Sequence, residues 1–168
     1  MNRIEYNFRE KFGGSDSFVA AYKFPNELIR PYYSALISLI RNKTLSPNYQ
    51  PNFLRGATPL MLAVQLNDLD GIDYLLQNGA DPNMLDNEKI LLLIEDRGMT
   101  ALHYAAIMNN SEAYRKLLEA GASENIRAQR GETARDIARN IAAGQIYRDP
   151  SSYSGYVFNE KFEIVEKR

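Results

Sequence analysis

The chain has 168 residues, of which 45% are hydrophobic and 24% charged, and its formal net charge at pH 7 is −1. This length and composition are ordinary for one globular domain, and the balanced charge argues against nucleic acid or an anionic membrane as the main partner, since both favour a clustered basic face. Cysteine is absent, which excludes a disulfide framework and a thiol nucleophile.

Residues 1–25 are predicted to form an N-terminal extension that packs on the rest of the chain. Within residues 3–12, Ile4, Tyr6 and Phe8 alternate with polar neighbours, which predicts a short half-buried strand. The first twelve residues carry charges throughout and lack the apolar run of a signal peptide. We therefore expect a cytoplasmic protein, or one secreted into a host cell without such a signal.

The segment 26–52 is interpreted as a degenerate copy of a repeat that caps the N-terminal end of a stacked array. Pro31 is expected to open a helix that carries Ser34–Arg41. The sequence Leu39–Asn48 resembles the ending Leu75–Asn83 further along the chain, with one residue more. Terminal units of stacked arrays are expected to depart from the pattern of the inner units.

Two well-formed copies of the repeat follow, over residues 53–83 and 98–127. In each copy two glycines lie 23 positions apart, namely Gly56 and Gly79, and Gly98 and Gly121. Repetition of this kind is typical of an array of stacked units.

Each copy is predicted to hold two helices. Thr58 and Thr100 are good N-caps because their hydroxyls can accept an N–H of the first turn, and Pro59 follows at the one helical position that needs no N–H. The second helices carry apolar residues at helical spacing and end before Gly79 and Gly121, which suit a left-handed C-terminal cap.

The two copies are separated by an inserted segment, 84–97. The distance from Asn83 to Gly98 is nine residues longer than the corresponding distance from Asn125 to Gly131. The insertion lengthens one loop and contains five consecutive large apolar residues, Ile90–Ile94. This run is too short to span a bilayer. It either anchors a partner protein or folds back onto the chain's own helices.

The C-terminal part is predicted to contain a capping unit over 128–146 and an aromatic tail over 147–168. Thr133–Asn140 has the pattern of a first helix, with Arg135 at a position that suits an outer unit. Within 156–165, Tyr156 and Phe158, and then Phe162 and Ile164, stand at alternate positions, which predicts strand structure. The tail either covers the end of the array or docks on a partner.

The paired phrases resemble the ankyrin repeat. Gly98-Met-Thr-Ala-Leu-His-Tyr-Ala-Ala106, then Leu117-Leu118 and Gly121-Ala122, matches nearly all of the family pattern, and the earlier copy has Met61 in the place of His103. The resemblance implies an all-α ankyrin-repeat solenoid of about four units including two degenerate caps, with short strands at the two termini. It also implies a non-catalytic module that binds another protein through the concave face and the loops between units, which we call fingers.

Positions that meet partners in the related scaffold carry over to this chain as follows: Leu54, Arg55, Ala57, Gln65, Leu66, Asn78, Asp96, Arg97, Met99, Ile107, Met108, Arg130 and Glu132. The inserted finger adds Ile90, Leu92 and Ile94. Leu66, Met99, Ile107 and Met108 are apolar residues at positions that are usually exposed, so they suggest an adaptable contact surface. The alternative is that the long finger or the tail covers them.

Catalysis is not expected. His103 is the single histidine, and in the ankyrin family this histidine is structural. Without cysteine or a second histidine the chain offers no metal cluster built on histidine and no catalytic triad, so we predict no metal, no cofactor and no enzyme activity. We expect a monomer whose partner is a protein, with neither nucleic acid nor a membrane bound.

Other interpretations stay open. The partner is a host protein if the chain is a secreted bacterial effector. A second hypothesis is a regulatory or assembly subunit of an enzyme complex that docks through the tail. A third is a small-ligand pocket between the long finger and the flanks. Asn83 also resembles ankyrin asparagines that host hydroxylases modify.

Overall fold

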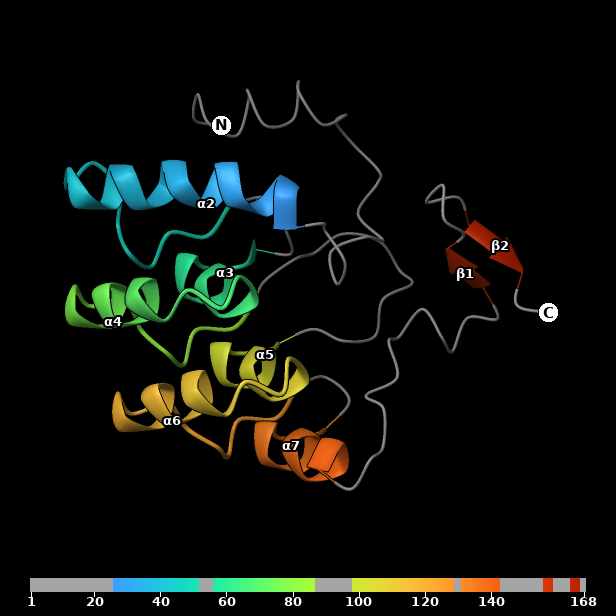
Figure 1. Cartoon of the computed structure of the whole chain (residues 1–168). Coiled ribbons are helices and arrows are strands. Elements are labelled where there is room, and N and C mark those ends of the chain that lie inside the picture. The colour runs from blue at the N-terminus through green and yellow to red at the C-terminus, as the bar shows by residue number, and fades with distance from the viewer. Residues whose placement is uncertain are drawn as a thin grey trace.

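The computed structural model describes residues 26–51, 56–86, 98–128, 131–142, 156–158 and 164–166. The described helices form one stack (Figure 1): α2 (Asn26–Arg41), α3 (Pro59–Gln65), α4 (Leu69–Gln77), α5 (Ala101–Ile107), α6 (Ser111–Glu119) and α7 (Ala134–Ala142). The predicted all-α solenoid is confirmed. None of these described helices combines the length and apolar character that crossing a membrane requires.

The helices form two columns. The inner helices α3, α5 and α7 pack on one another in succession, while α4 pairs with α3, α6 pairs with α5, and α4 packs on α6 (Figure 1). We call α4 and α6 outer helices. The C-terminal half of α2 belongs to the column of outer helices, because α2 ends with the same hydrogen bond as α4 and α6. The N–H of Thr44 bonds to the carbonyl of Leu39, as Ala80 bonds to Leu75 and Ala122 to Leu117.

Burial differs between the columns. All residues of Pro59–Val64 and of Ala101–Ala106 are buried, because each inner helix lies between neighbours. Small side chains such as Ala63 and Ala105 allow this close approach. An outer helix buries one stripe only, such as Ile72 and Leu75 on α4. The apolar spacing of the sequence therefore distinguishes the two kinds of helix.

The outer helices end in the left-handed backbone region. Gly79 and Gly121 have φ of 88° and 89°, values that glycine adopts without strain. Lys43 takes the same place after α2, with φ of 56°. The degenerate N-terminal capping unit therefore keeps the shape of the cap without the residue that favours it.

An asparagine side chain joins neighbouring units at two places. The amide Nδ2 of Asn48 donates to the carbonyl of Gly79 at 3.0 Å, and its Oδ1 accepts the N–H of Asp81 at 2.7 Å. Asn83 does the same one unit further, with Gly121 at 3.1 Å and Ser123 at 2.7 Å. We call this pair of bonds the asparagine clamp.

The start of α2 differs from the prediction. The helix begins at Asn26, five residues before Pro31, rather than at Pro31. Pro31 lies inside the helix and is exposed, so the carbonyl that lacks an intrahelical donor there can be hydrated.

The C-terminal capping unit, which holds α7 and is called the third unit because it is the third to contain an inner helix, is incomplete among the described residues. The chain turns after α3 and α5 at Asn67 and Asn109, whose φ values are 54° and 51°. Ala142 stands at the corresponding place, and α7 continues through it. Alanine tolerates a positive φ less well than asparagine, which favours helix over turn at this position. The structure describes no outer helix after α7.

Two short strands lie near the C-terminus. Strands β1 (Tyr156–Phe158) and β2 (Ile164–Glu166) pair antiparallel, with Val157 opposite Val165. The alternation in 156–165 therefore belongs to a hairpin and not to one strand. The strand predicted within 3–12 lies outside the described residues, as does most of the aromatic tail.

Candidate partner-binding surface

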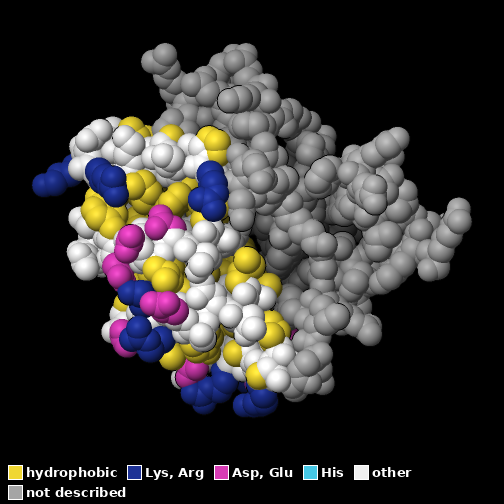
Figure 2. Space-filling model, viewed as in Figure 1, with side chains coloured by type: hydrophobic (Ala, Val, Ile, Leu, Met, Phe, Trp, Pro, Cys, Tyr) yellow, Lys and Arg dark blue, Asp and Glu magenta, His cyan; other side chains and the backbone are white. Residues whose placement is uncertain are grey.

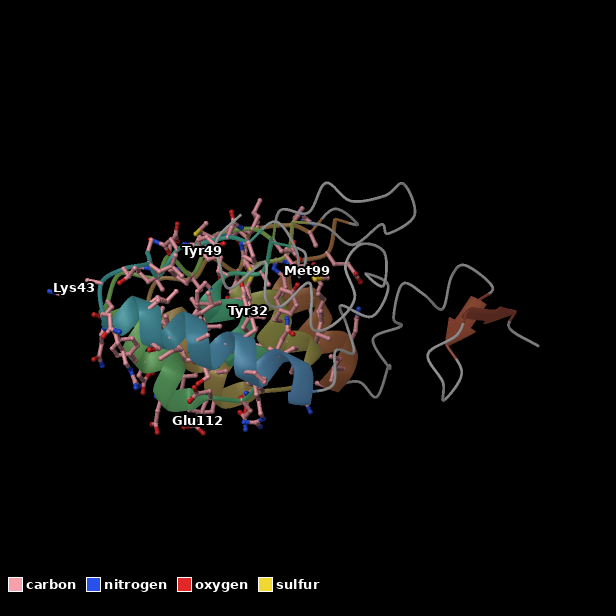
Figure 3. All side chains as sticks on the ribbon, turned by 90° about the horizontal axis from the view of Figure 1, so that it is seen from above. Tyr32, Lys43, Tyr49, Met99 and Glu112 are labelled. Atoms are coloured by element: carbon pink, nitrogen blue, oxygen red, sulfur yellow. The ribbon has the colours of Figure 1, made fainter. Side chains whose placement is uncertain are left out.

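The candidate surface is formed by the C-terminal ends of the inner helices and by the bases of the fingers. Met108, which follows α5, is 52% exposed, and Ile107 before it is half-buried. Gln65 and Glu132 are half-buried, and Asn78 is exposed on the other side of its unit, at the end of α4. Figure 3 looks along the stack and shows Tyr49 and Met99 on the loop side, opposite Glu112 of α6.

Half of the candidate residues lie outside the described part of the chain. They are Leu54, Arg55, Ile90, Leu92, Ile94, Asp96, Arg97 and Arg130. The role assigned to them from the sequence stays a prediction.

Three candidates are buried, and for Leu66 and Met99 this corrects the expectation that they are exposed. Ala57 is 1% exposed, Leu66 is 7% exposed and Met99 is not exposed at all. All three belong to the hydrophobic core. Burial of Met99 follows from its backbone, which is bonded on both sides to Asp86 and brings the side chain inward. These side chains stabilise the array and are not available to a partner in this structure.

Asp86 closes the base of the inserted finger. Its N–H donates to the carbonyl of Met99 at 2.8 Å, and its Oδ1 accepts the N–H of Met99 at 2.7 Å. Its Oδ2 accepts the hydroxyl of Tyr104, on α5, at 2.8 Å. The carboxylate is 4% exposed, so these bonds replace the water that the charge loses on burial.

The same pairing occurs without an insertion in the third unit. There the N–H of Ala128 bonds to the carbonyl of Glu132, four positions on, whereas Asp86 and Met99 are thirteen positions apart. The nine extra residues predicted from the spacing therefore lie between Asp86 and Met99. Asp86 was not predicted from the sequence. An acidic residue at the start of an insertion is the signal that could have indicated its role in closing the finger base.

Adjacent fingers are also tied together. The amide of Gln50 donates to the carbonyl of Gly56 at 3.1 Å and to the carbonyl of Leu85 at 2.6 Å. The side chain of Leu85 is 44% exposed. Sequence reasoning missed Leu85 as a candidate contact, because a single leucine in a polar turn gives no periodic signal.

The outer helices present interleaved charges (Figure 2). The ammonium of Lys116 on α6 contacts Asp73 of α4 at 2.6 Å. The guanidinium of Arg41 lies over the ring of Tyr74, 5.3 Å from its centroid. The hydrogen bond from Arg135, and to a lesser extent the one from Tyr114, lowers the pKa of the Glu124 carboxyl. Mixed charge of this kind offers no single-signed field for a polyanion.

His103 is buried and bonded within the array. Its Nδ1 accepts the N–H of Thr100 at 3.1 Å, so the ring proton lies on Nε2, which faces the carbonyl of Glu132 at 3.4 Å. Burial lowers the pKa of His103, and the bonds to the backbone of Glu132 and Ile126 oppose the shift. These contacts tie α5 to the third unit, which is a structural role. Among the described residues no group of three or more side chains of the metal-binding types comes together.

The chain is similar in sequence to known proteins that contain ankyrin repeats. A family model described as ankyrin repeats (3 copies) matches residues 39–129. The chain is 35% identical over 95 residues to neurogenic locus notch homolog protein 1 of Danio rerio, which covers 56% of the chain and 3% of that protein.

Two further relatives are an ankyrin repeat and SAM domain-containing protein 6 of Rattus norvegicus and a human transient receptor potential cation channel subfamily A member 1. The first is 38% identical over 82 residues, 49% of the chain and 8% of the relative. The second is 34% identical over 92 residues, 40% of the chain and 8% of the relative. The chain thus spans less than a tenth of the length of each of these relatives.

Proposed function

Because this chain belongs to the ankyrin-repeat family, whose repeats are generally protein–protein interaction modules, we propose that it is a non-catalytic module that binds one partner protein through its concave face and fingers. The observation that supports this proposal is the exposure of Met108 beside the half-buried Ile107, at the end of an inner helix. An exposed methionine next to further apolar surface is an adaptable contact.

We propose that the inserted finger contributes to the same surface. Asp86 and Met99 fix where the finger leaves the array, and the apolar residues Ile90, Leu92 and Ile94 lie between them in sequence. We include Arg55, Arg97 and Arg130, which surround the finger bases in sequence, as polar contacts at the rim of the surface.

The finer proposal is that the module works in a cytoplasm, and that its partner is a host protein if the chain is a secreted effector. The alternative is a regulatory or assembly subunit of an enzyme complex that docks through residues 147–168. Removal of these residues separates the two. The main proposal expects partner binding to persist, and the alternative expects it to be lost while the helical signal is kept.

The direct test uses the full chain as bait to identify a partner from its own cells, followed by calorimetric titration with the purified partner. Met108→Asp and Leu92→Asp are expected to weaken binding at least about tenfold, as is usual for loss of a central apolar contact. Leu118→Asp is the matched control, because it places the same charge on an exposed leucine of the outer helix α6. Unchanged affinity in both test variants would show that the surface is wrongly placed.

A further inference from the structure

In the described part of the chain, the outer column ends at α6. No described helix lies beyond α6 in that column (Figure 1). The equivalent apolar residue of each outer helix is progressively less covered: Ile40 is 5% exposed, Leu76 is half-buried, and Leu118 is 37% exposed. Leu118 therefore stands where a further outer helix would pack.

Among the described residues, no helix follows α7. Helix α7 continues through Ala142, where the earlier units turn at Asn67 and Asn109. The clamp residue of this unit, Asn125, is exposed, and no described outer helix follows α7 to offer its amide the bonds that Asn48 and Asn83 make. The end of the array thus has the inner helix of a third unit without its described outer partner.

The charges around Leu118 are balanced and arranged as opposite pairs. Arg115 and Glu119 form an ion pair one turn apart on α6, with both side chains 61% exposed. Arg135 of α7 pairs with Glu124, and Arg139 pairs with Asp136 at 3.8 Å. A surface that meets its own copy cannot carry much net charge, because every uncompensated charge would then face itself.

The order of charges on α6 selects the arrangement of the second copy. When the twofold axis runs perpendicular to α6, the two α6 helices are antiparallel, so the positive end of the Arg115–Glu119 pair meets the negative end of its counterpart. A head-to-tail contact lacks this match. It would set Arg115 against α2, whose described exposed charges, Arg30 and Arg41, are cations like it.

We propose that this end of the array is a self-association surface. Two copies pair about a twofold axis, α6 against α6, with Leu118 contacting its counterpart and Arg115 of each copy facing Glu119 of the other. This goes beyond partner binding at the concave face and departs from the monomer expected from the sequence. Because the contact is centred on one leucine of each copy, we expect weak association, with a dissociation constant on the order of 100 μM.

The test is sedimentation equilibrium of the full chain at low ionic strength, from about 10 μM to about 1 mM so that it brackets the expected constant. The mass is expected to rise from 19.1 kDa toward twice that value. Leu118→Asp should weaken association at least tenfold, since it would place two carboxylates at the centre of the contact. Met108→Asp, on the partner-binding surface, should leave it unchanged.

Exchanging the charges of Arg115 and Glu119 distinguishes this pairing from nonspecific hydrophobic association through an exposed leucine. Arg115→Glu alone and Glu119→Arg alone should each weaken association, because like charges then face each other across the axis. The double variant Arg115→Glu with Glu119→Arg should restore it. A constant mass of 19.1 kDa throughout, or no recovery in the double variant, overturns the proposal and leaves the concave-face proposal untouched.

Discussion

The hydroxyl of Tyr33 donates a hydrogen bond to Oδ2 of Asp68 at 2.8 Å, which joins α2 to the residue that caps α4. The other oxygen of Asp68 accepts the N–H of Gly71 at 3.0 Å. A Cβ built on Gly71 would lie 2.1 Å from the Tyr33 hydroxyl and 2.3 Å from the Asp68 Oδ2. The missing side chain at Gly71 is therefore what leaves room for the bond between the first two units.

Gly71→Ala is expected to lower the free energy of unfolding by about 1–3 kcal/mol, because the new methyl group displaces the Tyr33–Asp68 contact. At an ordinary exposed helical position the same change would stabilise the protein by about 1 kcal/mol. Urea unfolding followed by circular dichroism measures the difference. In a Tyr33→Phe background the hydroxyl is gone, so the cost should be smaller. An equal cost in both backgrounds would contradict the explanation.

The asparagine clamp makes a second, paired prediction. Asn83→Ala removes both bonds to the next unit, and we expect a loss of about 1–2 kcal/mol, since the carbonyl of Gly121 and the N–H of Ser123 lose their partners. Asn125→Ala should change stability by less than about 0.5 kcal/mol, because no described outer helix lies beyond Asn125 for its amide to bond. Equal losses in the two variants, by chemical unfolding, would show that the clamp contributes nothing.

Local chemistry explains why the units could be predicted from the sequence. A helix start needs a capping side chain such as Thr58, and a helix end needs a residue that accepts positive φ such as Gly79. Both residues lie within a few positions of the helix end that they stabilise, so a short stretch of sequence reveals them. Lys43 shows the limit of this reasoning, because it adopts the cap conformation with no sequence signal for it.

The burial of the candidate surface could not be predicted in the same way. Met99 is unexposed because Asp86, thirteen positions earlier, binds its backbone, and Leu66 belongs to a core contributed by several units. A family pattern gives the position of such residues in the unit, but it does not show whether an inserted finger buries them. Met108, at the place equivalent to Leu66, stays exposed, so position in the repeat alone does not decide exposure.

Asp86 should be among the most sensitive positions of the array. Asp86→Ala leaves the N–H of Met99 and the hydroxyl of Tyr104 without the carboxylate that accepts them, at an expected cost of about 2–4 kcal/mol. Asp86→Asn keeps one oxygen acceptor and should lose less. Chemical unfolding gives both values, and amide exchange at Met99 should be faster in the alanine variant. Native-like exchange there would argue against a role in closing the finger base.

The cap of each inner helix uses a different acceptor for the N–H of its threonine. In the first copy it is the sulfur of Met61, at 3.4 Å from the Thr58 nitrogen, and in the third it is the carboxylate of Asp136, at 3.0 Å from that of Thr133. His103 alone among these three titrates near neutral pH, and its Nδ1 must stay unprotonated to accept from Thr100. This makes His103→Met a conservative comparison, since methionine already fills the place in the first copy.

The stability should therefore depend on pH through His103. Burial holds the pKa of His103 below its ordinary value of 6.5, so the unfolded chain takes up a proton that the folded chain does not. This contribution is fully present above about pH 6.5 and falls as the pH decreases below it, by at most about 1.4 kcal/mol per pH unit. The wild type should thus lose more stability than His103→Met between about pH 7.5 and pH 5.5. The pKa values of Glu124 and Asp136 are also lowered, so these two groups titrate at lower pH, and they do so in both proteins alike.

Urea unfolding of both proteins across this pH range measures the difference in stability. Parallel curves for the two proteins would mean that His103 carries a proton in the folded state as readily as in the unfolded one.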